Sequence, residues 1–166
     1  MKIKELFQFV FALYGNRKFL IDMTKRDFRN KSLGSFLGII WSFIQPLVFL
    51  LVIWFVFEMG FKSKPVGDYP FILWLTPGFI IWTFFAESLN GATNSILESQ
   101  YLVKKVKFRI GMMPVVKILS ALMVHLFFIL FMILMFIIYG KGFSIHIIQL
   151  LYYLFATVVF VLGLSW

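Results

Sequence analysis

Residues 87–109 read ESLNGATNSILESQYLVKKVKFR and form the one long polar passage inside an otherwise apolar chain. The passage ends in a cluster of cations, and only Glu87 and Glu98 oppose them with negative charge. Apolar blocks lie on both sides, and about 20 apolar residues suffice for a helix to cross the hydrocarbon of a bilayer. The passage is therefore interpreted as a loop on one face of a membrane.

The composition excludes an ordinary soluble domain. Of 166 residues, 61% are hydrophobic and 14% are charged, whereas soluble domains are about half apolar and a quarter charged. The net charge of +9 sits between apolar blocks rather than along one face, which favours membrane topology over nucleic-acid binding. The chain has no cysteine, so it has no disulfide, thiol nucleophile or cysteine-based metal site. These features predict an integral membrane protein.

Hydropathy predicts an all-α, polytopic membrane protein with four transmembrane helices. The spans are expected at about 35–60, 71–86, 112–139 and 147–166, and the transmembrane domain covers 35–166. Pro46 is expected to kink the first span, and the sequence Thr76-Pro77-Gly78 to interrupt the second near its middle. The fourth span ends at Trp166 without a polar flank, so we expect a fragment of a longer protein.

The segment 1–34 is predicted to hold an amphipathic helix at 17–31 before the first span. One broad arc of its helical wheel is apolar, while the cations gather on the other side: Lys18, Lys25, Arg26 and Arg29. This pattern is typical of a helix that lies in the membrane interface among anionic headgroups. The alternative is a solvated juxtamembrane tail.

The distribution of cations predicts the orientation. Eight Lys and Arg precede the first span and five surround the central loop, which makes thirteen on one side against three on the other. Because cytoplasmic loops carry the excess of Lys and Arg, we expect the N-terminus and the 87–111 loop in the cytoplasm. This places the chain in the cytoplasmic membrane as a multi-pass protein.

The residues predict no catalytic centre, metal site or cofactor site. The carboxylates are scattered, and the chain contains neither HExxH, GxSxG nor a P-loop. An energy source, if one is needed, must therefore come from another polypeptide. His125 is the one ionisable group well inside the third span; it is either functional or a neutral histidine bonded to a neighbouring helix.

Several short motifs resemble a known family. They are Arg26-Asp27-Phe28 with Ser32-Leu33-Gly34 and Trp41-Ser42, then Pro77-Gly78 with Glu87-Ser88-Leu89, then Leu102-Val103-Lys104-Lys105-Val106 with Phe108 and Pro114. In this order they are similar to the permeases of ABC exporters for polysaccharides and polyol phosphates, which export O-antigen, capsule or wall teichoic acid. The chain departs from the family's pattern at Gln45 and at 109–111.

The resemblance implies a permease of six transmembrane helices, a homodimer, and a separate ATP-binding subunit. A coupling helix within about 94–103 would dock on the ATPase, with contacts from Ser95, Glu98, Tyr101, Lys104 and Lys105. The alternative for the lysines is a role in topology alone.

The resemblance also suggests where a lipid-linked glycan or polyol phosphate would bind. Its phosphate would meet Lys18, Lys25, Arg26 and Arg29, although ordinary anionic lipid suits the same cations. A sugar pathway is predicted along the aromatic residues Trp41, Trp74, Trp82, Phe84 and Phe85, for which packing or interfacial anchoring is the alternative. The predicted function is the membrane subunit of an ATP-driven glycan exporter. Non-transporting alternatives are a membrane scaffold, or a transferase whose catalytic residues lie outside this chain.

Overall fold

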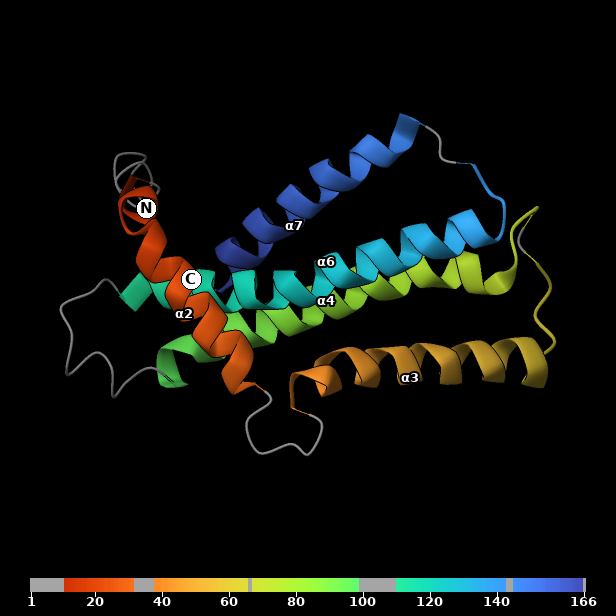
Figure 1. Cartoon of the computed structure of the whole chain (residues 1–166), viewed down its shortest axis with the longest axis horizontal. Coiled ribbons are helices and arrows are strands. Elements are labelled where there is room, and N and C mark those ends of the chain that lie inside the picture. Colours follow the sequence, from red (N-terminus) through yellow and green to blue (C-terminus); the bar gives the residue numbers. More distant parts are fainter. Residues whose placement is uncertain (1–10, 32–37, 66, 99–109, 143–144, 166) are drawn as a thin grey trace.

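The computed structural model describes residues 11–31, 38–65, 67–98, 110–142 and 145–165. Every element assigned in these ranges is helical, which confirms the all-α prediction. The five α-helices, labelled as in Figure 1, are α2 (Arg17–Asn30), α3 (Trp41–Phe55), α4 (Phe71–Glu98), α6 (Met113–Ile138) and α7 (Gln149–Leu164).

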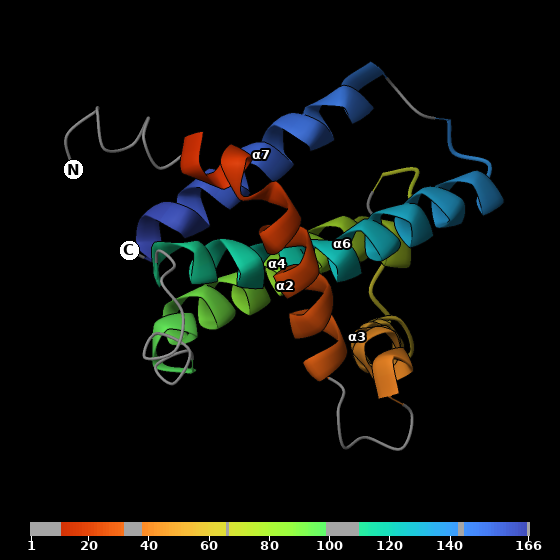
Figure 2. The ribbon, with the colours of Figure 1, turned by 60° about the vertical axis from the view of Figure 1, so that its left-hand side comes forward.

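Three helices run alongside one another and two are inclined to them. Figure 1 shows α4 and α6 side by side along most of their length, with α3 beside the first part of α4. The α7 helix is inclined to α6, and α2 crosses α4 and α6 near the end where α4 finishes and α6 begins, as Figure 2 also shows. The basic helix therefore lies across the end of the bundle.

Among the described residues, three helical segments are long and apolar enough to cross a membrane: Gly38–Gly60, Phe71–Ser95 and Met113–Ile138. The first consists of α3 with a short 3₁₀ turn before it and a π-helical turn, Val56–Gly60, after it. It agrees with the predicted span at 35–60, and α6 agrees with that at 112–139. The helix in the fourth predicted span, α7, has 16 residues and is shorter than the usual span.

The sequence prediction was wrong about the shape of the second helix. The α4 helix does not end at Ala86 but continues to Glu98, and it remains helical through Pro77. Its hydroxyl groups donate to carbonyl groups of the preceding turn, as from Thr76 to Ile72 at 2.6 Å and from Ser95 to Ala92 at 2.6 Å. These bonds satisfy polar side chains within the helix, so a polar sequence remains helical here.

Small residues bring α4 close to α6. Ser88, Ala92 and Ser95 of α4 are fully buried, as are Ser120 and Ala121 of α6 to within 1%. Close packing of small residues is a usual way for membrane helices to associate. Around them lies a core cluster that joins α4, α6 and α7, formed by Phe84, Ala92, Ile118, Ala121 and Val161.

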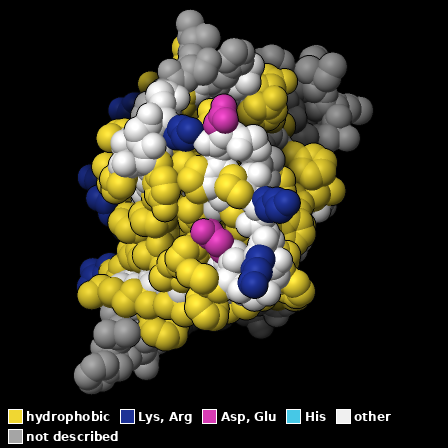
Figure 3. All heavy atoms as spheres, turned by 90° about the vertical axis from the view of Figure 1, so that its right-hand side faces the viewer, with side chains coloured by type: hydrophobic (Ala, Val, Ile, Leu, Met, Phe, Trp, Pro, Cys, Tyr) yellow, Lys and Arg dark blue, Asp and Glu magenta, His cyan; other side chains and the backbone are white. Residues whose placement is uncertain are grey.

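The outer surface is largely apolar. Figure 3 views the molecule from the end where α3 finishes and α4 begins, and hydrophobic side chains cover most of that face. Within α3 only Leu50 is buried, whereas Phe49 and Phe55 are more than half exposed. Surfaces of this kind suit a hydrocarbon environment and would aggregate in water.

Candidate functional site

The candidate site is the end of the bundle where α2 crosses α4 and α6. The inner face of α2 packs on α6, where Leu20 forms an apolar cluster with Met112 and Val116. Thr24 is also buried, whereas Ile21 is 51% exposed. Residues four and seven positions after Leu20 lie on the same helix face, so this face carries Thr24 and Asp27 as well.

The outer face of α2 is basic and exposed. All four predicted headgroup cations, Lys18, Lys25, Arg26 and Arg29, are exposed. Three of them line a surface hollow of about 470 Å³, whose described lining is Asp22, Lys25, Arg26, Arg29 and Asn30. Among the described residues no carboxylate lies within salt-bridge distance of these four cations. With three cations against Asp22, the hollow has a net positive charge, which suits a phosphate or an anionic headgroup.

Lys117 joins three helices at this end. Its Nζ, on α6, lies 2.9 Å from Oδ1 of Asp27 on α2 and 2.6 Å from Oε2 of Glu98 on α4. The side chains of Lys117 and Asp27 are only 18% and 15% exposed, which limits screening by water. Sequence analysis did not predict this pairing. The signal was the acidic Asp27 seven residues after Leu20, on the face that packs.

A second ion pair also connects the N-terminal segment to α4. Nζ of Lys31, just after α2, lies 2.7 Å from Oε1 of Glu87. The two side chains are 26% and 41% exposed. Exposed pairs contribute little, about 0–1 kcal/mol each, so this pair is the weaker of the two connections.

Two of the five predicted ATPase contacts, Ser95 and Glu98, lie within the described residues. Ser95 is fully buried at the end of α4, so its side chain is not presented to a partner in this structure. Glu98 is 57% exposed at the last residue of the helix. Tyr101, Lys104 and Lys105 lie outside the described residues. A docking role for this group stays a prediction.

Two of the predicted pathway aromatics, Trp82 and Phe85 of α4, lie together with ring centroids 6.1 Å apart. Trp41, Trp74 and Trp82 are 46%, 58% and 65% exposed, whereas Phe84 is buried. Phe85 is half-buried and stacks on Phe160 of α7, with ring centroids 6.2 Å apart. A pathway role for these residues stays a prediction.

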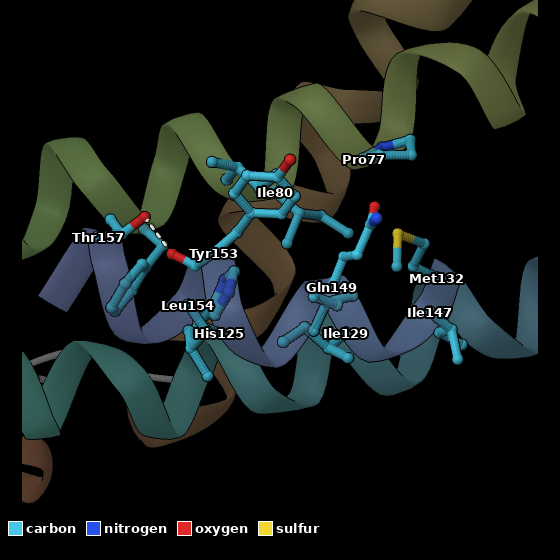
Figure 4. A pocket seen from close by; sticks show the side chains of 13 residues that line it. Pro77, Ile80, His125, Ile129, Met132, Ile147, Gln149, Tyr153, Leu154 and Thr157 are labelled. Atoms are coloured by element: carbon cyan, nitrogen blue, oxygen red, sulfur yellow. Dashed lines mark hydrogen bonds between the residues drawn. The ribbon is translucent and has the colours of Figure 1, made fainter. Parts of the chain in front are cut away.

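His125 lies in the interior beside Phe84. The two rings stack with centroids 4.4 Å apart, and His125 is 7% exposed. A cavity of about 240 Å³ lies between α4, α6 and α7 (Figure 4). Its polar lining residues are His125, Gln149, Tyr153 and Thr157, and the remaining lining residues are apolar. The stacking supports packing against α4, while Nδ1 of His125 is buried without a hydrogen-bond partner among the described residues, so whether His125 is functional stays open.

These observations define a class of protein. Three apolar helices of spanning length, a largely apolar surface and a basic helix across one end describe a multi-pass α-helical membrane protein. Among the described residues, no group of three His, Cys, Asp or Glu side chains could hold a metal ion.

Comparison with known proteins finds similarity to permeases of O-antigen export systems. The chain is 24% identical over 161 residues to the O-antigen export system permease protein RfbA of Myxococcus xanthus, which covers 97% of this chain and 61% of that protein. Two proteins of the same name from Klebsiella pneumoniae are each 26% identical over 95 residues, or 57% of this chain and 36% of theirs. No family model matches. The chain is therefore similar along nearly its whole length to an O-antigen export permease, and it spans about three fifths of that Myxococcus relative.

Proposed function

We propose that the chain is part of the membrane subunit of an ATP-driven exporter that moves a lipid-linked O-antigen or a similar glycan across the cytoplasmic membrane. The relatives named as O-antigen export permeases carry this proposal, because one of them aligns with 97% of the chain. Teichoic acid, a polyol phosphate, is the other substrate class that the resemblance suggests. In this proposal the chain transports rather than catalyses, and it binds no cofactor itself.

The length of α4 supports coupling to a separate ATP-binding subunit. At 1.5 Å per residue its 28 residues extend about 42 Å, whereas the hydrocarbon core is about 30 Å thick. About 12 Å of helix therefore extends beyond the hydrocarbon, on the side where the basic 99–109 segment follows. A rigid helix of this kind transmits a displacement of that segment into the membrane as a rigid-body movement.

The basic hollow on α2 supports the substrate class. A lipid-linked glycan carries its phosphate groups at the membrane surface, and arginine binds phosphate oxygens in a bidentate manner. Arg26 and Arg29 line the hollow together with Lys25. We propose that this hollow receives the headgroup phosphate on the cytoplasmic side, with the N-terminus in the cytoplasm.

Co-purification tests the coupling. The double charge reversal Lys104→Glu with Lys105→Glu should lower the amount of ATP-binding subunit that co-purifies with the full-length permease by tenfold or more, with insertion unchanged. The matched control is Lys64→Glu, an exposed lysine in the loop before α4. Equal recovery of the ATP-binding subunit from both variants would contradict the docking role.

Solvent access tests transport against a scaffold role. The chain has no cysteine, so single cysteines placed along 71–86 report access without background labelling. An exporter predicts a row of positions on α4 that react with a membrane-impermeant thiol reagent and become protected when substrate is added. A scaffold subunit predicts no reactive position at membrane depth.

A further inference from the structure

We propose that Lys117 is a positioning residue that locks α2 to the end of α4, so that an anion held on α2 and the last turn of α4 move as one unit. This inference rests on the exporter function proposed above. It names the residue that connects the basic hollow on α2 to the end of α4, which precedes the segment proposed to dock on the ATPase. It names a residue that neither touches the proposed substrate nor docks on the proposed ATPase.

The first support is the geometry of the ion pairs. One ammonium group lies within 3 Å of two carboxylates that come from different helices, Asp27 and Glu98. Oδ2 of Asp27 is buried and has no hydrogen-bond partner among the described residues. Removing the Lys117 charge would leave a nearly buried carboxylate without its counter-ion, which is far more disruptive than losing an exposed pair. The position of α2 therefore depends on Lys117.

The second support is the division of α2 into two faces. Arg26 lines the basic hollow, whereas the next residue, Asp27, meets Lys117 on the packed side. Successive residues of a helix point about 100° apart, so one rigid helix carries the hollow on one side and the ion pair on another. If α2 shifts when an anion binds, Asp27 shifts with it and displaces the ammonium group of Lys117.

The third support is the path of the Lys117 side chain. A Cβ atom placed on Gly91 of α4 would lie 3.5 Å from Lys117 Cβ and 3.8 Å from its Cδ. The aliphatic stem thus runs along the surface of α4 before the ammonium group reaches Glu98. Lys117→Met keeps most of this packing and removes the charge, whereas Lys117→Arg keeps the charge.

Distance measurement tests the lock without any assumption about transport. Ile21 on α2 and Leu97 on α4 are 51% and 65% exposed, and the chain has no native cysteine, so both can be replaced by spin-labelled cysteine. The full-length protein is placed in bilayers of phosphatidylethanolamine and phosphatidylglycerol. We expect one narrow label-to-label distance distribution with Lys117 or Lys117→Arg, and a distribution at least twice as wide with Lys117→Met. Superimposable distributions for Lys117 and Lys117→Met would overturn the proposal.

Two variants that each remove one of the two ion pairs keep the test decisive if Lys117→Met fails to insert into the membrane. Asp27→Asn and Glu98→Gln each remove one carboxylate charge at nearly constant size. Each should widen the same distribution, since each releases one of the two helices from Lys117. Unchanged widths in both variants would equally overturn the lock.

Export assays test the consequence for function. With the ATP-binding subunit reconstituted, Lys117→Met should lower ATP-driven glycan export at least tenfold while co-purification stays within twofold, and Lys117→Arg should restore export. Lys64→Met, an exposed control, should export normally. Normal export by Lys117→Met, or a matching loss of co-purification, would overturn the proposed role.

If the unmodified protein neither binds the ATPase nor exports, the proposed function fails, while the label distances still decide whether Lys117 locks α2 to α4.

Discussion

Replacing Ile118 by alanine should identify the packing that holds the bundle together. Ile118 is 1% exposed on α6, where it meets Phe84 and Ala92 of α4 and Val161 of α7. Ile137 lies on the same helix but is 57% exposed. The two Ile→Ala substitutions remove the same atoms from the same helix, so their difference reports the packing alone.

The expected magnitude follows from the membrane environment. Helices that separate within a bilayer stay in an apolar medium, so burial against α4 gains little from transfer out of water. What remains is the cavity that the lost atoms leave. Three carbon atoms occupy roughly 80 Å³, and a cost of about 24 cal/mol per Å³ gives about 2 kcal/mol for Ile118→Ala. Lipid chains refill the space beside Ile137, so its replacement should cost less than about 0.5 kcal/mol.

Equilibrium unfolding measures the difference. The full-length protein in mixed micelles is unfolded with increasing SDS, and loss of helix packing is followed by tryptophan fluorescence. A difference of about 2 kcal/mol corresponds to about a 30-fold change in the folding equilibrium constant. If the two variants unfold with free energies within about 0.5 kcal/mol of each other, the packed core of α4, α6 and α7 does not stabilise the protein as argued here.

Three further predictions concern the surface, the interior and a helix end. Arg26→Gln should weaken binding of inorganic pyrophosphate about fivefold, since one cation near a membrane surface contributes about 1 kcal/mol, and calorimetry should show no change for Lys64→Gln. His125→Phe keeps a ring against Phe84 and should unfold within about 1 kcal/mol of the parent, whereas His125→Ala should cost 2 kcal/mol or more; equal losses would contradict a packing role. Gly140→Ala should cost about 1 kcal/mol in thermal unfolding because Gly140 has φ +65° at the end of α6, and Gly142→Ala should not.

Hydropathy predicted the long helices because a membrane span must satisfy its backbone internally and remain apolar over a fixed length. The same signal missed the end of α4, since residues 87–98 are polar and were assigned to a loop. The structure shows that these polar groups are accommodated in two ways. Hydroxyl groups such as that of Thr93 bond to the preceding turn, and Ala92 and Ser95 pack on α6. The small residues Ser88, Ala92 and Ser95 recur at spacings of four and three, and this periodicity could have predicted that the helix continues.

The ion pairs at the end of the bundle could not be predicted from the sequence, because their partners are brought together only by the tertiary structure. Lys117 and Asp27 are 90 residues apart in sequence, and a lysine near a span end is usually explained by snorkelling. Periodicity along α2 shows that Asp27 shares a face with Leu20, which predicts a buried acid that needs a cation. The sequence contains sixteen cations, so only the packing of α2 on α6 selects Lys117 among them.

The same pairing explains why the outer face of α2 stays positive. Three carboxylates at this end of the bundle, those of Asp27, Glu87 and Glu98, are held by Lys31 and Lys117. They are therefore not available to neutralise the cations around the hollow, where Asp22 is the one described acid. Asp27 thus lies on the packed side of α2 and the four cations on its outer side, an arrangement that the proposed binding of an anion would require.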